Sequence, residues 1–104
     1  MSTVEFIAML TPEDRYRHFH RRVKNSVVEF MLQYETKIGG EWHPVVRYDT
    51  AHGFAHRDLM DRSGREKKTP VFARNLNEAL TFADYDIKSN WRMYKREFLR
   101  GGDT

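Results

Sequence analysis

Residues 27–36 read Val-Val-Glu-Phe-Met-Leu-Gln-Tyr-Glu-Thr, and this stretch decides the fold of the 104-residue chain. From Val28 to Thr36, every second residue falls on one face and is apolar or only weakly polar. The opposite face carries Glu29, Gln33 and Glu35. A period of two is typical of a strand that buries one face and exposes the other, so the sequence predicts a half-buried strand here.

Turn signals on the C-terminal side of this strand predict further strands. At Ile38-Gly39-Gly40 we expect a three-residue loop, because this length sets Leu32 opposite Val46 and keeps the apolar residues on one face. A two-residue Gly-Gly turn would instead set Leu32 opposite Arg47. A second tight turn is expected at His52-Gly53, where glycine supplies a positive φ.

The remaining C-terminal residues predict one more strand and one long helix. Residues 65–73 can supply a fourth strand, with Pro70 favouring an edge position. Asn75 and Glu78 have the spacing of a capping box, and Gly101 follows the last apolar residue of the helix. One apolar stripe at helical spacing connects these ends: Leu76, Leu80, Ala83, Ile87, Trp91, Tyr94 and Phe98.

Together these elements predict an α+β fold in one domain, residues 1–104. We expect an antiparallel meander of three or four strands within residues 25–73, and one long C-terminal helix, residues 75–100, packed on one face. Residues 1–24 form an N-terminal basic segment. Thr11-Pro12-Glu13-Asp14 favours a short helix there, looser alternation after it favours a strand, and a partly disordered segment is a third alternative.

Composition restricts the function classes. The chain has no cysteine, which excludes disulfides and thiol nucleophiles and favours a cytoplasmic location. The apolar run from Val4 to Leu10 is short and is interrupted by Glu5, so we expect neither a signal peptide nor a membrane span. The formal net charge of +3 permits nucleic-acid binding without requiring it. No cofactor is predicted.

Polar chemistry is concentrated around the predicted turn at His52-Gly53. If these two residues form the tip, Asp49 faces His56 and Arg47 faces Asp58. These side chains would then stand with Glu29 on the sheet face opposite the helix, as a polar platform. Carboxylates beside an imidazole fix its tautomer and raise its pKa, which suits proton transfer near neutral pH.

This platform predicts a catalytic set of His56, Asp49, Arg47, His52 and Asp58. His56 would act as acid or base, Asp49 would orient it, and Arg47 or Arg57 would stabilise charge on a phosphodiester. A nucleic-acid-binding set joins Arg57 to the basic block: Arg15, Arg17, Arg21, Arg22 and Lys24.

Plainer interpretations stay open. The platform can be an ordinary salt-bridged outer face, and the basic block a solvated surface. A metal site would draw ligands from His18, His20, His52, His56, Asp49 and Asp58, but the strand pattern argues against a helical ligand pair at His52 and His56, so no metal is predicted.

The stretch from Arg47 to Gly53 and the later His56-Arg57-Asp58 resemble a family of small, uncharacterised prokaryotic domains without an assigned activity. The same hairpin is more distantly similar to the TumE-like toxins of toxin–antitoxin pairs, which carry an Arg-Tyr/Trp-Asp-Asn stretch followed by a histidine cluster. Thr50 stands in place of the Asn of this stretch. The shared positions are Arg47, Tyr48, Asp49, His52 and His56.

Two functions therefore compete. The first is an RNA-binding or toxin-like ribonuclease module that uses the polar sheet face, with RNA as its partner. The second is a non-catalytic protein-interaction domain whose salt-bridged sheet face or exposed edge strand binds a protein, such as an antitoxin-like one.

Overall fold

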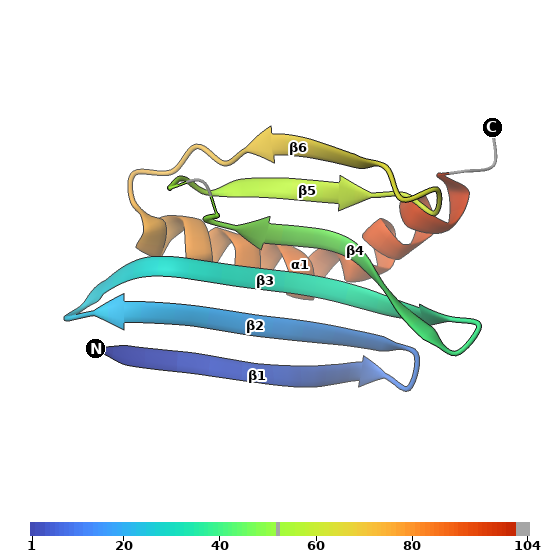
Figure 1. Ribbon diagram of the computed structural model, residues 1–104, viewed down its shortest axis with the longest axis horizontal. Helices are drawn as coiled ribbons and strands as arrows, with labels where there is room; N and C mark the ends of the chain where they lie inside the picture. Colours follow the sequence, from blue (N-terminus) through green and yellow to red (C-terminus); the bar gives the residue numbers. More distant parts are fainter. Residues whose placement is uncertain (52, 102–104) are drawn as a thin grey trace.

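The computed structural model describes residues 1–51 and 53–101, which form a six-stranded sheet and one helix (Figure 1). All neighbouring strands are antiparallel and follow one another in chain order, and α1 lies behind the sheet in Figure 1. The α+β meander with a C-terminal helix is confirmed, whereas the prediction of three or four strands is wrong. The elements are β1 (Ser2–Thr11), β2 (Asp14–Val23), β3 (Ser26–Ile38), β4 (Glu41–Asp49), β5 (His56–Met60), β6 (Glu66–Pro70) and α1 (Leu76–Arg100).

The two additional strands lie in the N-terminal segment, where the strand alternative holds and the predictions of a short helix and of partial disorder are wrong. Thr11 and Asp14 face each other across a two-residue turn made by Pro12 and Glu13. The Thr11 hydroxyl accepts a hydrogen bond from the Glu13 backbone N–H at 3.0 Å and donates one to Asp14 Oδ2 at 2.6 Å. The same residue types therefore serve a hairpin turn as readily as a helix cap.

Asp14 ties this hairpin to the rest of the protein. Its buried carboxylate accepts hydrogen bonds from the Tyr34 hydroxyl at 2.6 Å and the Thr36 hydroxyl at 3.0 Å, and Lys95 of α1 lies 3.2 Å away. Burial favours the protonated acid, but these donors and the Thr11 hydroxyl together outweigh it and hold the pKa of Asp14 below its ordinary value.

The turn between β3 and β4 differs from the predicted three-residue loop. Gly39 and Gly40 form a two-residue tip with φ angles of 60° and 82°, and Ile38 faces Glu41. A bulge beside Tyr34 then shifts the register, so that Val45 and Val46 are both buried. The bulge keeps the apolar residues of both strands on one face without the longer loop.

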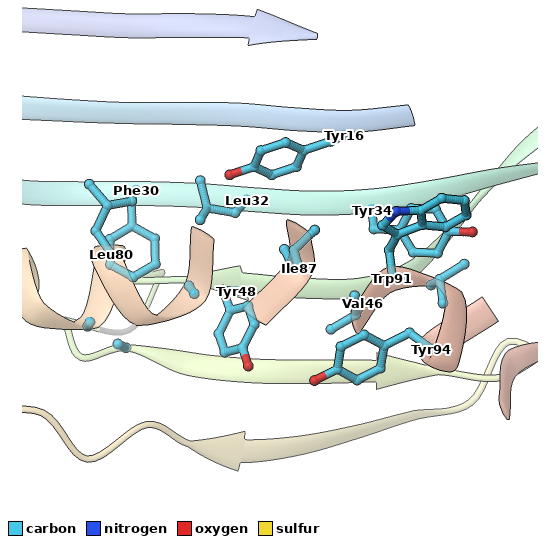
Figure 2. Close-up of a cluster of buried hydrophobic side chains, with 14 of the residues drawn as sticks. Tyr16, Phe30, Leu32, Tyr34, Val46, Tyr48, Leu80, Ile87, Trp91 and Tyr94 are labelled. Carbon is cyan, nitrogen blue, oxygen red and sulfur yellow. The ribbon is translucent and has the colours of Figure 1, made fainter. Parts of the chain in front are cut away.

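The helix packs its predicted stripe mainly on β3 and β4. Figure 2 shows Leu80, Ile87 and Trp91 against strand side chains that include Leu32. Asn75 caps the helix by accepting a hydrogen bond from the Glu78 backbone N–H at 2.8 Å, as the capping box predicts.

Hydroxyl groups of core tyrosines reach carboxylates at the margins of this core. Tyr16 donates to Asp84 at 2.6 Å, and Tyr48 donates to Asp86 at 2.7 Å. Burial raises the pKa of both tyrosines, and the neighbouring carboxylates add to this effect. Both phenols therefore remain neutral donors that fasten α1 to the sheet.

One face of the sheet and both of its edges lie away from the helix. The outermost strands are β1, at the bottom of Figure 1, and β6, at the top. Pro70 ends β6, in agreement with the predicted edge position. Among the described residues, α1 is too polar to cross a membrane.

The Asp14 cluster generates a prediction about acid stability. Because its pKa is lower in the folded state than in the unfolded chain, Asp14 stabilises the fold fully above about pH 4 and loses this contribution as the pH falls through the folded value. Urea denaturation between pH 7 and pH 2.5 should therefore show a shallower decline for Asp14→Asn than for the native protein. Equal declines would contradict the assigned role.

Candidate functional site

The candidate site lies on the sheet face opposite α1, where β4 and β5 run side by side. Asp49 faces His56 and Arg47 faces Asp58, as predicted. Tyr48 lies between Arg47 and Asp49 in the sequence and points to the helix side, where its hydroxyl donates a hydrogen bond to Asp86. Alternation along the two strands therefore gathers the four polar side chains on the opposite face.

His56 is the centre of this cluster. Its Nε2 lies 2.7 Å from Asp49 Oδ1 and 3.8 Å from Asp58 Oδ2. Asp58 also accepts a hydrogen bond from Lys68 of β6 at 2.8 Å, and Arg47 Nη1 lies 3.9 Å from its other oxygen. Acidic and basic groups therefore alternate around the imidazole.

Burial limits what this cluster can do. Only 1% of His56 and 2% of Asp58 are exposed, and Phe54 packs against the imidazole with 5.9 Å between the ring centroids. A general acid or base must come within hydrogen-bond distance of the reacting group. In this arrangement almost none of the His56 surface is open to a substrate phosphate, and its nearest polar neighbours are Asp49 and Asp58.

The network continues across the middle of the sheet. Arg47 Nε donates to Gln33 at 2.7 Å, Gln33 donates to Glu35, and Arg15 Nε donates to Glu35 at 2.5 Å. The Arg15 guanidinium also lies 4.1 Å from the centre of the Trp42 ring. This arrangement matches the interpretation of the platform as a salt-bridged outer face.

Asp49, His56 and Asp58 are also the described residues best placed to hold a cation. Their donor atoms all lie within 4.8 Å of one another. Lys68 already occupies one oxygen of Asp58. A divalent ion would have to displace this ammonium group, or bind beside it against its charge.

The predicted nucleic-acid-binding set is divided between the two faces of the sheet. Arg15, Arg17 and Arg21 alternate on the open face, where Arg21 pairs with Glu29 at 2.7 Å. Three others lie elsewhere: Arg22 contacts His20, Lys24 sits in the turn after β2 with φ 58°, and Arg57 donates to the Tyr94 hydroxyl. The set therefore does not form one continuous phosphate-binding surface.

The helix side of β2 carries a line of hydrogen-bonded side chains. The Tyr16 hydroxyl contacts His18 Nδ1 at 2.9 Å, and His18 Nε2 lies 2.7 Å from His20 Nδ1. Burial lowers the pKa of both histidines, with added repulsion from His20 at His18 and from Arg22 at His20. Neutral imidazoles in this position add no charge to the basic block.

A pocket of about 440 Å³ opens on the helix side, between the segment after β6 and the first turns of α1. Tyr48 and Arg57 contribute polar groups to it, and Phe72 and Phe82 contribute apolar walls. Arg57 already bonds to Tyr94, which in turn donates to Asp86. Tyr48 and Arg57 therefore belong to the network that fastens α1 to the sheet, while Glu78, which also lines the pocket, pairs with Arg74.

Two further residues or segments of the sequence-based prediction remain, His52 and the run from Val4 to Leu10. The assignment of His52 falls outside the described residues. The exposed apolar surface of β1 was missed, because the run from Val4 to Leu10 was considered only as a membrane or signal segment. The available signal was a run of apolar residues on both faces of a strand, interrupted only by Glu5, whose length suits a β-strand.

The fold and this face define a small α+β domain in which one helix covers a meander sheet and the other face bears an ion-pair network. The chain belongs to the family described as Domain of unknown function (DUF7718), whose model matches residues 1–104. No curated protein and no solved structure matches the chain.

The buried pair generates a prediction about stability. His56→Ala removes the 2.7 Å side-chain partner of Asp49 and leaves a cavity at a buried position, so the free energy of unfolding should fall by about 3 kcal/mol. Urea denaturation measures this change, with Lys67→Ala on the exposed strand β6 as a matched control that changes stability by less than about 0.5 kcal/mol. A similarly small effect of His56→Ala would contradict a structural role for the pair.

Proposed function

We propose that this domain is a non-catalytic protein-interaction module that binds its partner by strand addition at β1. The observation that carries the proposal is the exposure of this ten-residue edge strand. Four of its apolar side chains are 38–56% exposed: Val4, Phe6, Ile7 and Met9. A long apolar edge strand is a template for pairing with another chain.

The two faces of β1 support the same function. Phe6 lies on the helix side, where it stacks on His18 with the ring centroids 4.7 Å apart, whereas Ile7 faces Arg17 on the opposite side. A flat protein surface resting on one side of the sheet would leave one of these residues in water. A strand added along the edge places side chains beside both of them.

By contrast, β6 is a poor template. It has five residues, and Glu66, Lys67 and Lys68 place charges along it. Short length, lysine and a terminal proline are the features by which natural sheets prevent edge pairing. The proposed interaction is therefore specific to the N-terminal edge strand, β1. The absence of cysteine is compatible with a cytoplasmic location for this interaction.

A second candidate is the RNA-directed role that the TumE-like resemblance implies. It is favoured by the 2.7 Å contact between Asp49 and His56, the geometry in which a carboxylate orients an imidazole. Burial of His56 weighs against it, and so does the pairing of Arg15 and Arg21, two members of the predicted nucleic-acid-binding set, with carboxylates.

Site-specific photo-crosslinking distinguishes the two functions. A benzophenone amino acid is placed at Phe6 on the β1 edge, at Met31 beside Asp49 on the open face, or, as the control, at Phe72, which is 93% exposed and follows β6 at the other edge of the sheet. Irradiation of cells that express each variant should give protein adducts from position 6 only. RNA adducts from position 31, with none from position 6, would overturn the proposal in favour of the RNA-directed role.

A further inference from the structure

The outer edge of β1 is complementary to itself. Two identical strands that pair in antiparallel fashion are related by a two-fold axis. In such a pair, the numbers of any two facing residues add up to the same sum, the constant of the register. The constant must be even, because residues of opposite parity point their backbone groups and side chains in opposite directions. Only registers centred on a single residue are therefore possible.

The position of Glu5 distinguishes among the three registers centred on Glu5, Phe6 and Ile7, near the middle of β1. Centring the pair on Glu5 would place two carboxylates directly opposite each other, which is destabilising. Centring it on Ile7 would place Glu5 opposite Met9 of the other copy, beside an Arg15 that Glu35 and Trp42 already hold. Neither register gives Glu5, the one charged residue of β1, a suitable partner.

The register centred on Phe6 resolves this charge. Glu5 then faces Ile7 of the other copy, and the neighbour of Ile7 in β2 is Arg17. Arg17 has a 43% exposed side chain and only a long contact of 3.8 Å with Glu35. The backbones of Glu5 and Arg17 are then two strand spacings apart, about 10 Å. Their two long side chains can bridge this distance.

The same register suits the apolar residues. On the helix side, Phe6 faces Phe6 of the other copy, and Val4 faces Ala8 of the other copy. Aromatic pairs and aromatic–aliphatic neighbours are among the stabilising cross-strand combinations. We infer that β1 pairs with β1 of a second copy of this chain, antiparallel and centred on Phe6. This inference rests on the proposed function of β1 and names its partner.

The resulting dimer has one continuous sheet with six strands from each copy, and both helices lie on the same face. Nine residues of each β1 overlap, from Ser2 to Leu10. This is fewer than the roughly 20–30 residues a side of a standard interface, so the dissociation constant should be in the micromolar range.

Cysteine cross-linking tests the register directly, because the native chain has no cysteine. Facing residues in an antiparallel pair have Cα atoms about 4.5–5.5 Å apart, which is within disulfide range. The Cα atoms of residues displaced by two positions are too far apart for a disulfide. Mild oxidation should convert Phe6→Cys to a covalent dimer and leave the matched variants Glu5→Cys and Ile7→Cys monomeric. Efficient dimers of either control variant, or none of Phe6→Cys, would overturn the inference.

Sedimentation equilibrium on the cysteine-free protein gives a second, independent test. Glu5→Gln and Arg17→Gln should each weaken dimerisation by roughly threefold to fivefold, and the double variant should be no weaker than either single one. Additive losses, or a native protein that stays monomeric at 100-fold above a micromolar concentration, would contradict the pairing.

These outcomes separate the inference from the proposed function. If position 6 photo-crosslinks to a different protein and Phe6→Cys stays monomeric, the dimer is wrong and strand addition at β1 stands. If position 6 gives no protein adduct and Phe6→Cys stays monomeric, both are wrong.

Discussion

One helix of 25 residues has to stabilise a sheet of six strands, and the rest of the structure follows from this constraint. The helix packs mainly on β3 and β4 and reaches β2 through side chains such as Asp84. Burial of apolar surface is the dominant favourable term in folding, so the strands beneath α1 carry most of the stability. The opposite face and the edges need other means of support.

The open face is supported by charge pairing rather than by apolar burial. His56 and Asp58 are buried there without a covering helix: Lys68 of the neighbouring strand β6 bonds to Asp58, and Phe54 of the connection between β4 and β5 packs on the His56 ring. A buried ion pair costs desolvation and is tolerated only when all of its members are paired. The residues of the predicted catalytic cluster therefore also link β4, β5 and β6 on the open face of the sheet.

The sequence was informative where one rule applied and ambiguous where two rules competed. The stripe from Leu76 to Phe98 and the facing pairs around Asp49 were predictable, because each follows a single period. Thr11 and Asp14 suit both a helix cap and a hairpin turn, and only their contacts with Tyr34 and the Glu13 backbone distinguish the two. The bulge after Tyr34 could not be predicted, because a one-residue shift restores the apolar pattern that a longer loop would also give. Burial of His56 was equally hidden, since it depends on side chains from separate segments, such as Asp49 of β4 and Phe54 of the connection before β5.

Local stability should decline from the helix-covered strands towards the exposed strand β1. Residue-resolved hydrogen exchange measures this gradient, at a low protein concentration where the chains are separate. We expect the slowest exchange for amides of β3 and β4, and fast exchange for the alternate amides of β1 that point away from β2. Equally slow exchange of all β1 and β3 amides under these conditions would contradict this expectation, because β1 would then be covered rather than exposed.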